Sequence, residues 1–189
     1  SAHVTNSEAY DFNSAYAPAV NLGTTSISGN TTQWTGASST NWYTAGNWSS
    51  GVPTSSLNCI INDKANDPVI SSGTAVCKSM SVGNGTLTLN AGSLELYRSL
   101  ESTGTINSSA PIVIRDDGAT MTSQNIDVSS TLNELQFNKT AGGSIQVNST
   151  VTVTNAVPIN GSQNFTMDIT NNNGLVLNGG LTVSGATIE

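Results

Sequence analysis

The chain has 189 residues and a net charge of −7, and only 9% of its residues are charged, against about 25% in an average soluble domain. Its five basic residues are too few and too scattered to neutralise a phosphate backbone, which excludes nucleic acid as a partner. They equally exclude attachment to an anionic membrane surface. No apolar run approaches the length of about 18 residues that a membrane span needs, so insertion into a bilayer is not expected.

Residues 1–33 are polar and show no regular hydrophobic period, which predicts an N-terminal extension or arm. Alone, such a segment buries too little apolar surface to become ordered. It either packs along its own domain or adds to the edge of a neighbouring subunit as an extra strand. The apolar residues assigned to this assembly arm are Val4, Tyr10, Phe12, Tyr16, Val20 and Leu22.

The next segment, residues 34–56, contains all three tryptophans, Trp34, Trp42 and Trp48, interrupted by turn-forming glycines and Pro53. Two interpretations are open. The indoles can form a cap over the apolar end of a solenoid, which needs capping to stay soluble. They can also form a platform on which sugar rings stack. The surrounding Gly and Ser residues favour the cap.

Residues 62–67 present four Asn or Asp side chains in six positions. Because oxygen ligands suit calcium, Asp63, Asn66 and Asp67 are a weak calcium candidate. The spacing matches neither the EF-hand nor the nonapeptide calcium repeat. We therefore expect an Asx-rich loop without metal, and no cofactor.

From residue 57 onward, short runs alternate apolar and polar residues and are separated by turn signals such as Gly-Asn-Gly and Asp-Asp-Gly. Such alternation is typical of half-buried strands. The predicted strands cover residues 57–61, 68–70, 75–82, 86–89, 93–96, 112–114, 125–128, 134–137, 144–147, 150–153, 165–169, 175–177 and 181–183.

This pattern predicts an all-β domain over residues 34–189, with no long helix. The favoured architecture is a parallel β-helix, or solenoid, in which each strand stacks on its counterpart one turn earlier. In support, residues 86–96 echo residues 174–183. The alternative is a β-sandwich with Greek-key links, which also has strands every 8–12 residues. The shortness of the runs favours the solenoid.

The two cysteines, Cys59 and Cys77, lie 18 positions apart. We predict a disulfide between them, with two buried free thiols as the alternative. A disulfide closing this loop would stabilise the fold by about 3 kcal/mol in the chain-entropy model. It would also agree with export from the cytoplasm.

Catalysis requires a nucleophile with its base, a pair of carboxylates or a metal. The single histidine, His3, lies in the extension. Asp116-Asp117-Gly118 is interpreted as a turn, although Asp116, Asp117, Asp127 and Glu134 are the carboxylates from which a glycosidase pair would be drawn. Arg98 and Arg115 alone are too few basic residues for a polysaccharide lyase. We expect no enzymatic activity.

Residues 34–53, with Trp-x-Gly, a spaced Trp and then Asn-Trp-x-x-Gly-x-Pro, resemble a motif of large secreted bacterial surface proteins. The motif is found in autotransporter passenger regions and in repetitive proteins exported by Bacteroidota. Residues 67–80 and 134–153 are similar to the stacked repeats of the same proteins. The resemblance implies a fibrous or adhesive segment without catalytic residues. Unlike those relatives, this chain carries the 1–33 extension and shows no recognisable C-terminal sorting domain.

Together, composition and resemblance predict a secreted bacterial cell-surface protein with a structural role. It would be the subunit of a self-assembling fibre or filament, or a segment of an adhesin. Its partners would be further copies of itself or neighbouring surface-protein repeats, with residues 1–33 supplying the exchanged strand or arm. Such a head-to-tail contact does not close on itself and therefore propagates. The rival is a carbohydrate-binding module that contacts glycans through Trp34, Trp42 and Trp48.

Overall fold

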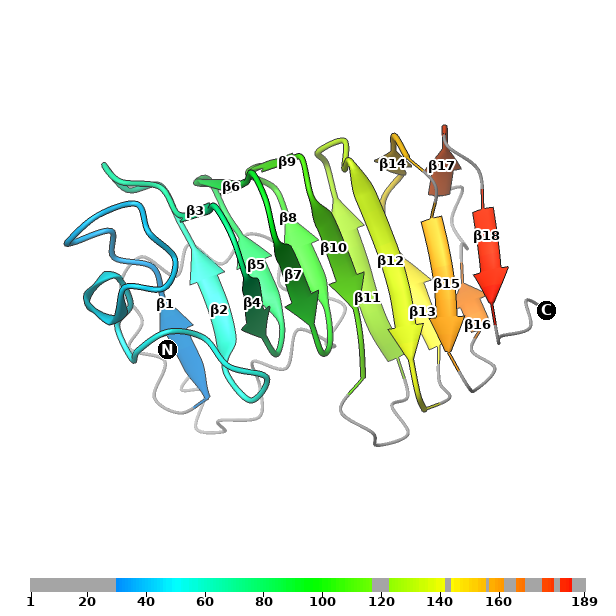
Figure 1. Cartoon of the computed structure of the whole chain (residues 1–189), viewed down its shortest axis with the longest axis horizontal. Coiled ribbons are helices and arrows are strands. Elements are labelled where there is room, and N and C mark those ends of the chain that lie inside the picture. The colour runs from blue at the N-terminus through cyan, green and yellow to red at the C-terminus, as the bar shows by residue number, and fades with distance from the viewer. Residues whose placement is uncertain are drawn as a thin grey trace, which may run out of the picture.

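Each turn of the chain adds strands to a stack of parallel ladders, as a computed structural model of the protein shows (Figure 1). The structure describes residues 30–116, 123–141, 144–155, 157–161, 166–168, 175–178 and 181–184. Every strand pairing among these residues is parallel; the register of β2 on β5, for example, places Cys59 beside Met80. The chain is therefore an all-β solenoid, as predicted, and the sandwich alternative is wrong.

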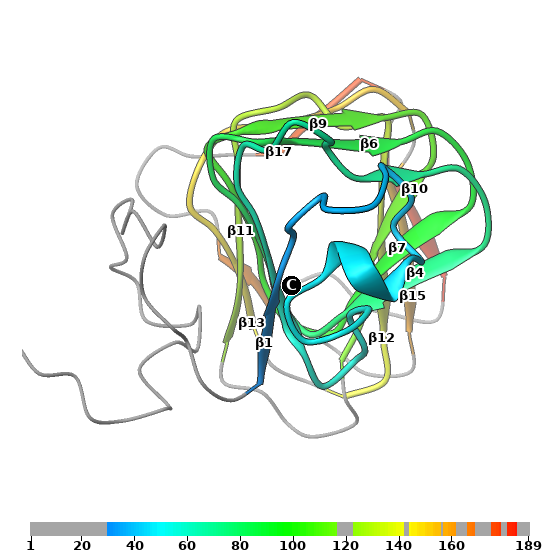
Figure 2. The ribbon, with the colours of Figure 1, turned by 90° about the vertical axis from the view of Figure 1, so that its left-hand side faces the viewer.

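The solenoid has three faces, which surround one interior when it is viewed from its N-terminal end (Figure 2). The first face consists of β1 (Thr31–Gln33), β2 (Asn58–Ile61), β5 (Met80–Val82), β8 (Leu100–Ser102), β11 (Ser123–Val128), β13 (Ser144–Val147) and β16 (Thr166–Asp168). The second face consists of β3 (Val69–Ile70), β6 (Thr86–Leu89) and β9 (Thr105–Ser108), and further along of β14 (Val151–Val153) and β17 (Leu175–Leu177). The third face consists of β4 (Thr74–Cys77), β7 (Ser93–Leu96), β10 (Pro111–Ile114), β12 (Glu134–Lys139), β15 (Val157–Gly161) and β18 (Leu181–Ser184).

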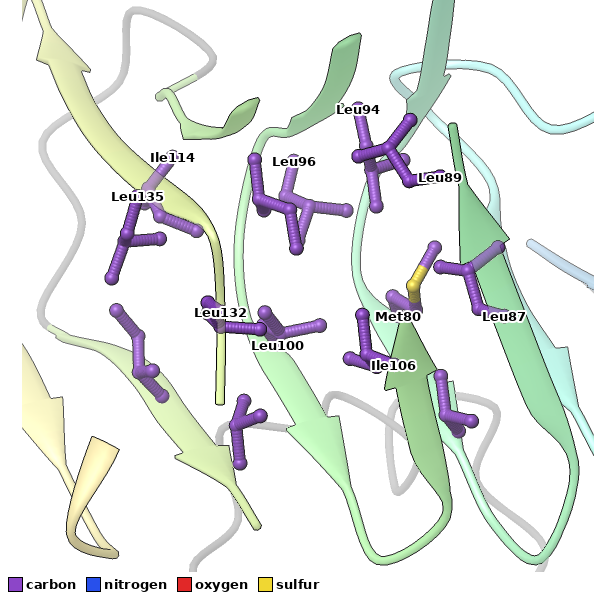
Figure 3. Packing of buried hydrophobic residues seen from close by; sticks show 14 of the residues in the cluster. Met80, Leu87, Leu89, Leu94, Leu96, Leu100, Ile106, Ile114, Leu132 and Leu135 are labelled. Atoms are coloured by element: carbon purple, nitrogen blue, oxygen red, sulfur yellow. The ribbon is translucent and has the colours of Figure 1, made fainter. Parts of the chain in front are cut away.

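The interior is built from apolar side chains that stack on one another from turn to turn. Alternate residues of a strand point to opposite sides of its sheet, so Thr86–Leu89 buries both leucines and leaves both threonines half-exposed. On the third face, Leu96 lies beside Ile114, and Ile114 beside Phe137. Figure 3 shows part of this interior, with Leu96 and Ile114 of the third face among the labelled side chains. Burial of one such Leu or Ile side chain contributes about 1.5–3 kcal/mol.

Sharp corners join the faces, and one corner divides a run that is predicted as a single strand. The predicted strand 75–82 is two strands, β4 and β5, because the chain turns between the first and third faces at Lys78 and Ser79. Lys78 N donates to Leu57 O, and Cys59 N donates to Ser79 O, both at 2.8 Å and both between neighbouring turns. The corner itself is thus held by hydrogen bonds between turns.

Four strands were absent from the sequence prediction. β8 and β9 carry a single apolar residue each, Leu100 and Ile106, and β15 contains Pro158. Too few apolar residues or a proline weakens the alternation that marks a strand. β1 falls within the predicted extension, yet it pairs with β2 in register, so the solenoid includes residues 31–33. The described residues contain one short 3-10 turn, η2 (Ala45–Asn47), and no helix of a length and hydropathy that would cross a membrane.

Candidate functional site

The three tryptophans form a packed cluster at the N-terminal end of the solenoid. They belong to the segment 34–56, which crosses this end of the stacked turns (Figure 2). Trp48 stands edge-to-face between the other two, with ring centroids 5.0 Å from Trp34 and 4.7 Å from Trp42. Aromatic pairs prefer this geometry because the positive ring edge meets the negative face. Trp34 and Trp42 are fully buried, and Trp48 is 4% exposed.

Backbone hydrogen bonds attach this tryptophan cap (residues 34–56) to the first complete turn. Trp34 N donates to Ile60 O at 2.8 Å, and Trp42 N donates to Val69 O at 3.2 Å. Asn41 forms a parallel bridge with Val69. The cap therefore continues the ladders of two faces by a few residues and occupies backbone groups that would otherwise be unpaired at a sheet edge.

Inside the cap, Asn47 fixes the loop that carries the tryptophans. Its side chain is completely buried. Its Oδ1 accepts hydrogen bonds from the backbone N–H groups of Ser38 and Ser39, at 2.8 and 2.9 Å. Its Nδ2 donates to Asn41 O at 2.9 Å and to Ser39 Oγ at 3.0 Å. A buried amide with this many partners orders the loop, because losing any one of them leaves a polar group unsatisfied.

This burial bears on the two interpretations of the tryptophans. A sugar-binding platform needs exposed ring faces, whereas the interior packing of Trp34, Trp42 and Trp48 leaves none available. The burial of all three indoles therefore favours the cap interpretation. The neighbouring Tyr43 is 41% exposed, and its hydroxyl donates to Ser72 O at 2.8 Å.

The Asx-rich loop anchors the cap. Asn66 O accepts the Trp34 Nε1 hydrogen bond at 2.6 Å, and Asn66 Nδ2 donates to Gly36 O at 2.8 Å. Asp63 is exposed and its backbone N–H donates to Asn84 Oδ1. No group of three His, Cys, Asp or Glu side chains within the described part of the chain could hold a metal ion. Two of the candidate calcium residues, Asn66 and Asp63, thus take part in contacts within the protein, and Asp67 lies half-buried beside them.

The two cysteines lie under the cap, but they are not joined. Cys59 on β2 and Cys77 on β4 are both fully buried, with their sulfur atoms 3.3 Å apart, whereas a disulfide has a bond of about 2.05 Å. The predicted disulfide is therefore wrong in this structure, which has the buried thiols given as the alternative. Burial raises the pKa of Cys77 well above its ordinary value, with smaller contributions from the hydrogen bond and the charge of Cys59. The Cys77 thiol is therefore protonated at neutral pH.

The carboxylates considered for a glycosidase pair are separated by the fold. Asp127 lies on β11 of the first face, and Glu134 on β12 of the third, where Glu134 accepts a hydrogen bond from Gln136 Nε2 at 2.6 Å. Asp116 lies two positions beyond the end of β10 and is buried, and the rest of the predicted turn, Asp117-Gly118, lies outside the described residues.

Instead, the fold brings Asp127 beside Glu101, a residue that no sequence motif singles out. The two residues are partners in the register of β11 on β8, and both point outward from the first face. Burial, and secondarily the negative charge of Asp127, raises the pKa of Glu101 to about 7. Finding this pair requires the turn-to-turn register, which the sequence does not display.

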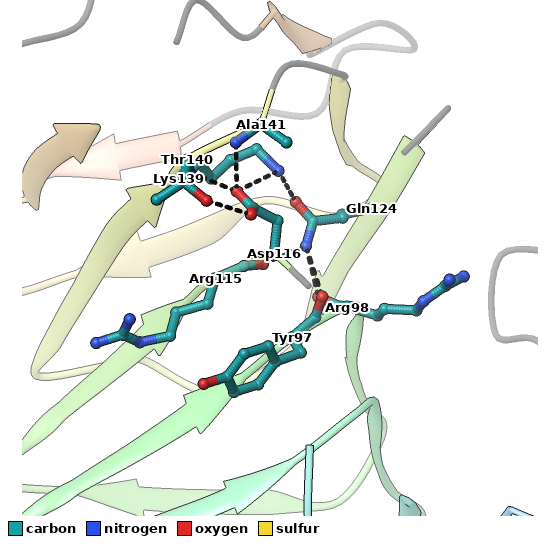
Figure 4. A network of polar contacts seen from close by, with 8 residues as sticks. All are labelled: Tyr97, Arg98, Arg115, Asp116, Gln124, Lys139, Thr140 and Ala141. Carbon is teal, nitrogen blue, oxygen red and sulfur yellow. Dashed lines mark hydrogen bonds and ion pairs between the residues drawn. The ribbon is translucent and has the colours of Figure 1, made fainter. Parts of the chain in front are cut away.

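A second polar cluster, also unforeseen, is buried at the end of the third face (Figure 4). Lys139 Nζ donates to Gln124 Oε1 and lies 4.0 Å from Asp116 Oδ2. Asp116 also accepts hydrogen bonds from Thr140 N (2.6 Å), Thr140 Oγ1 (2.8 Å) and Ala141 N (3.0 Å). A charged pair is costly to bury without such partners, and here both members have them.

The described geometry thus defines a parallel β-solenoid closed at its N-terminal end by an aromatic cap. A family model for a domain of unknown function, DUF8693, matches residues 33–130, from the last residue of β1 into the fourth complete turn. Because the match covers more than half of the 189 residues, the chain belongs to this family. No curated protein and no solved structure matches the chain. The family description assigns no activity.

Proposed function

We propose that this protein is a non-enzymatic structural component of a bacterial cell surface, secreted from the cell and assembled into a fibre with further copies of itself. The observation that carries the proposal is how the turns pair. Each described turn hydrogen-bonds to the next through parallel strands, so the same ladders accept a further strand of matching register from a second copy.

Strand edges that present unpaired N–H and C=O groups are templates for pairing with another chain. An arm from a second copy that adds to such an edge would continue the solenoid in one direction. Repeated head-to-tail contacts of this kind extend without closing. The arm residues Val4, Tyr10, Phe12, Tyr16, Val20 and Leu22 lie outside the described residues, so their role rests on composition alone.

The outer surface of the protein supports a structural role over a catalytic one. Outward positions carry mostly uncharged Ser, Thr and Asn residues, and stacked pairs bond along the axis, as when Ser93 Oγ donates to Thr74 Oγ1 at 3.2 Å. Short uncharged side chains keep a low-charge protein soluble. The same composition and the resemblance of residues 34–53 to secreted surface proteins support location outside the cell.

Electron microscopy of the full chain and of a chain lacking residues 1–29 tests the proposal. The truncation must end before Thr31, because β1 belongs to the solenoid. We expect filaments only from the full chain. A matched control keeps all residues but replaces Phe12 and Tyr16 by Ser, which should also prevent assembly if the arm binds by its apolar side chains. Circular dichroism must show the same β-sheet content in all three proteins.

Single particles in every sample would overturn the fibre and leave the other structural role, a segment of an adhesin. Filaments from the truncated chain would show that assembly occurs without the arm. Release of new reducing ends from soluble glycans would contradict the absence of catalysis.

A further inference from the structure

The row of inward-pointing side chains on the third face ends in a charged pair, whereas the preceding inward positions carry apolar residues. The register of β10 on β12 places Ile112 beside Leu135 and Ile114 beside Phe137. Two residues further on, Asp116, just beyond the end of β10, and Lys139, the last residue of β12, are both buried and continue the inward side of these strands. Their side chains are 1% exposed. An amine and a carboxyl group are thus held together in the interior, on successive turns.

The surroundings of this pair match what amide formation requires. Asp116 Oδ2 accepts hydrogen bonds from two backbone N–H groups, those of Thr140 at 2.6 Å and Ala141 at 3.0 Å. Two such donors stabilise the negative charge that develops on a carbonyl oxygen under nucleophilic attack. The Thr140 hydroxyl donates to the other oxygen, Oδ1, at 2.8 Å. Figure 4 shows the carboxyl group between these donors and the lysine amine.

Gln124 holds the amine on its other side. Gln124 Oε1 accepts a hydrogen bond from Lys139 Nζ. Its own Nε2 donates to Arg115 O at 2.6 Å, Tyr97 O at 3.2 Å and Arg98 O at 3.4 Å. These backbone contacts fix the orientation of the Gln124 amide, so Gln124 is a positioning residue that keeps Nζ close to Asp116.

We propose that Lys139 and Asp116 condense to an intramolecular isopeptide bond that joins two successive turns. A proton first passes from the Lys139 ammonium group to the Asp116 carboxylate, which gives a neutral amine and a neutral acid. This transfer is favoured by the interior, where separated charges are poorly solvated. The Nζ lone pair then forms a bond to Cγ, and the carbonyl π electrons move to Oδ2, between the Thr140 and Ala141 N–H groups.

In the second half of the reaction, the nitrogen loses a proton to the Oδ1 hydroxyl, and the C–Oδ1 bond breaks. The carbonyl bond re-forms and one water molecule leaves. The ammonium and the carboxylate are thus converted into one neutral amide plus water, with no oxidant or other reactant. Removal of both charges from the interior also ends the desolvation cost of the ion pair.

Intact-mass spectrometry of the purified, denatured full chain is the test. We expect a mass below the sequence value by one water molecule, and a proteolytic digest with a branched peptide that joins residues 116 and 139. Lys139→Arg keeps the positive charge but cannot form this amide, so its mass should equal the sequence value. The matched control Lys64→Arg, at an exposed position, should retain the water loss.

A sequence mass for folded wild-type protein would overturn the proposal without any variant. Loss of ammonia with a Lys139–Gln124 branched peptide would overturn the assignment of Asp116 as the acceptor. Water loss mapped to a cyclic imide at Asp117-Gly118 would also overturn it. For the positioning residue, Gln124→Leu should raise the fraction of unlinked chain in freshly purified protein, which a purely structural role would leave unchanged.

Discussion

Gly36 lies where the tryptophan cap meets the Asx-rich loop, and its carbonyl oxygen accepts a hydrogen bond from Asn66 Nδ2. Its φ of 60° lies in the left-handed region, and a Cβ atom there would lie 2.5 Å from Asn66 O, the oxygen that accepts the Trp34 Nε1 hydrogen bond. We predict that Gly36→Ala lowers the free energy of unfolding by about 2 kcal/mol or more, through backbone strain and this clash. Chemical denaturation measures the change.

Gly51 supplies the matched control for that substitution. Its φ of 83° carries the same backbone strain, but nothing lies within 4 Å of the position a Cβ would take. Gly51→Ala should therefore show only the strain, about 1 kcal/mol. Equal losses in both variants would mean that the contact between Gly36 and Asn66 does not anchor the cap.

The raised pKa of Glu101 makes stability depend on pH. A carboxyl group whose pKa rises from 4.5 to about 7 on folding binds protons more tightly in the native state. Stability should therefore fall as pH rises from about 4.5 to about 7 and stay lower above that. Glu101→Gln should stabilise the protein at pH 8 by about 1 kcal/mol, after allowance for solvent screening of a half-buried group, and should have no effect at pH 4.

Thermal unfolding at both pH values distinguishes this effect from a general one. Asp127→Asn, which removes the neighbouring charge, should give a smaller gain at pH 8, because burial is the larger cause of the shift. A gain of equal size at pH 4 would show that the ionisation of Glu101 is not responsible.

The thiols of Cys59 and Cys77 should be unreactive in the native protein. Both are buried, and the raised pKa of Cys77 leaves little thiolate, the reactive form. A thiol-specific reagent without reductant should therefore detect no thiol in native protein and both after unfolding in denaturant. Absence of thiols in the unfolded protein would instead reveal a disulfide.

At the scale of the element, the tryptophan cap should determine the stability of the N-terminal end. Trp48 contacts both other indoles and donates from Nε1 to Trp42 O at 2.7 Å. Trp48→Ala should cost about 3–5 kcal/mol through the cavity it leaves. The exposed neighbour Tyr43 provides the control, because Tyr43→Phe removes only one exposed hydrogen bond, worth about 1 kcal/mol. Tryptophan fluorescence during denaturation reports both changes.

The alternation of apolar and polar residues predicts a strand correctly where the apolar side chains point inward and the polar side chains point outward. Runs such as residues 86–89, with two inward and two outward side chains, are predicted as strands and found as strands. The same alternation misleads where a polar residue points inward. Asp116 and Lys139 continue the third-face ladder. The sequence alone, without the register of one turn on the next, gives no reason to place either residue inside.

The pairing of distant residues is the part that sequence patterns do not reveal. The contact of Glu101 with Asp127 and of Lys139 with Gln124 depends on how many residues each turn contains. That number varies: the first-face register advances 20 residues from Met80 to Leu100, and 26 from Leu100 to Ile126. A single fixed repeat length therefore cannot locate these sites.

At the scale of the whole molecule, charge opposes association. The chain carries 12 acidic and 5 basic residues, so like-charged subunits repel one another. Raising the salt concentration from about 0.01 M to about 1 M shortens the screening length from about 30 Å to about 3 Å. If the protein forms the proposed fibres, light scattering should show faster assembly at high salt. Slower assembly would indicate that contacts between opposite charges hold the subunits together.

Turns of different length share the same packed interior. Between Leu100 and Ile126 the chain accommodates six more residues than in the turn before it, yet both residues remain stacked in the same parallel ladder. The longer turn therefore does not displace the strand that follows it from the ladder. Corners are the places where such a protein can gain or lose epitopes, or accept a grafted loop, while its pitch and its packed interior stay the same.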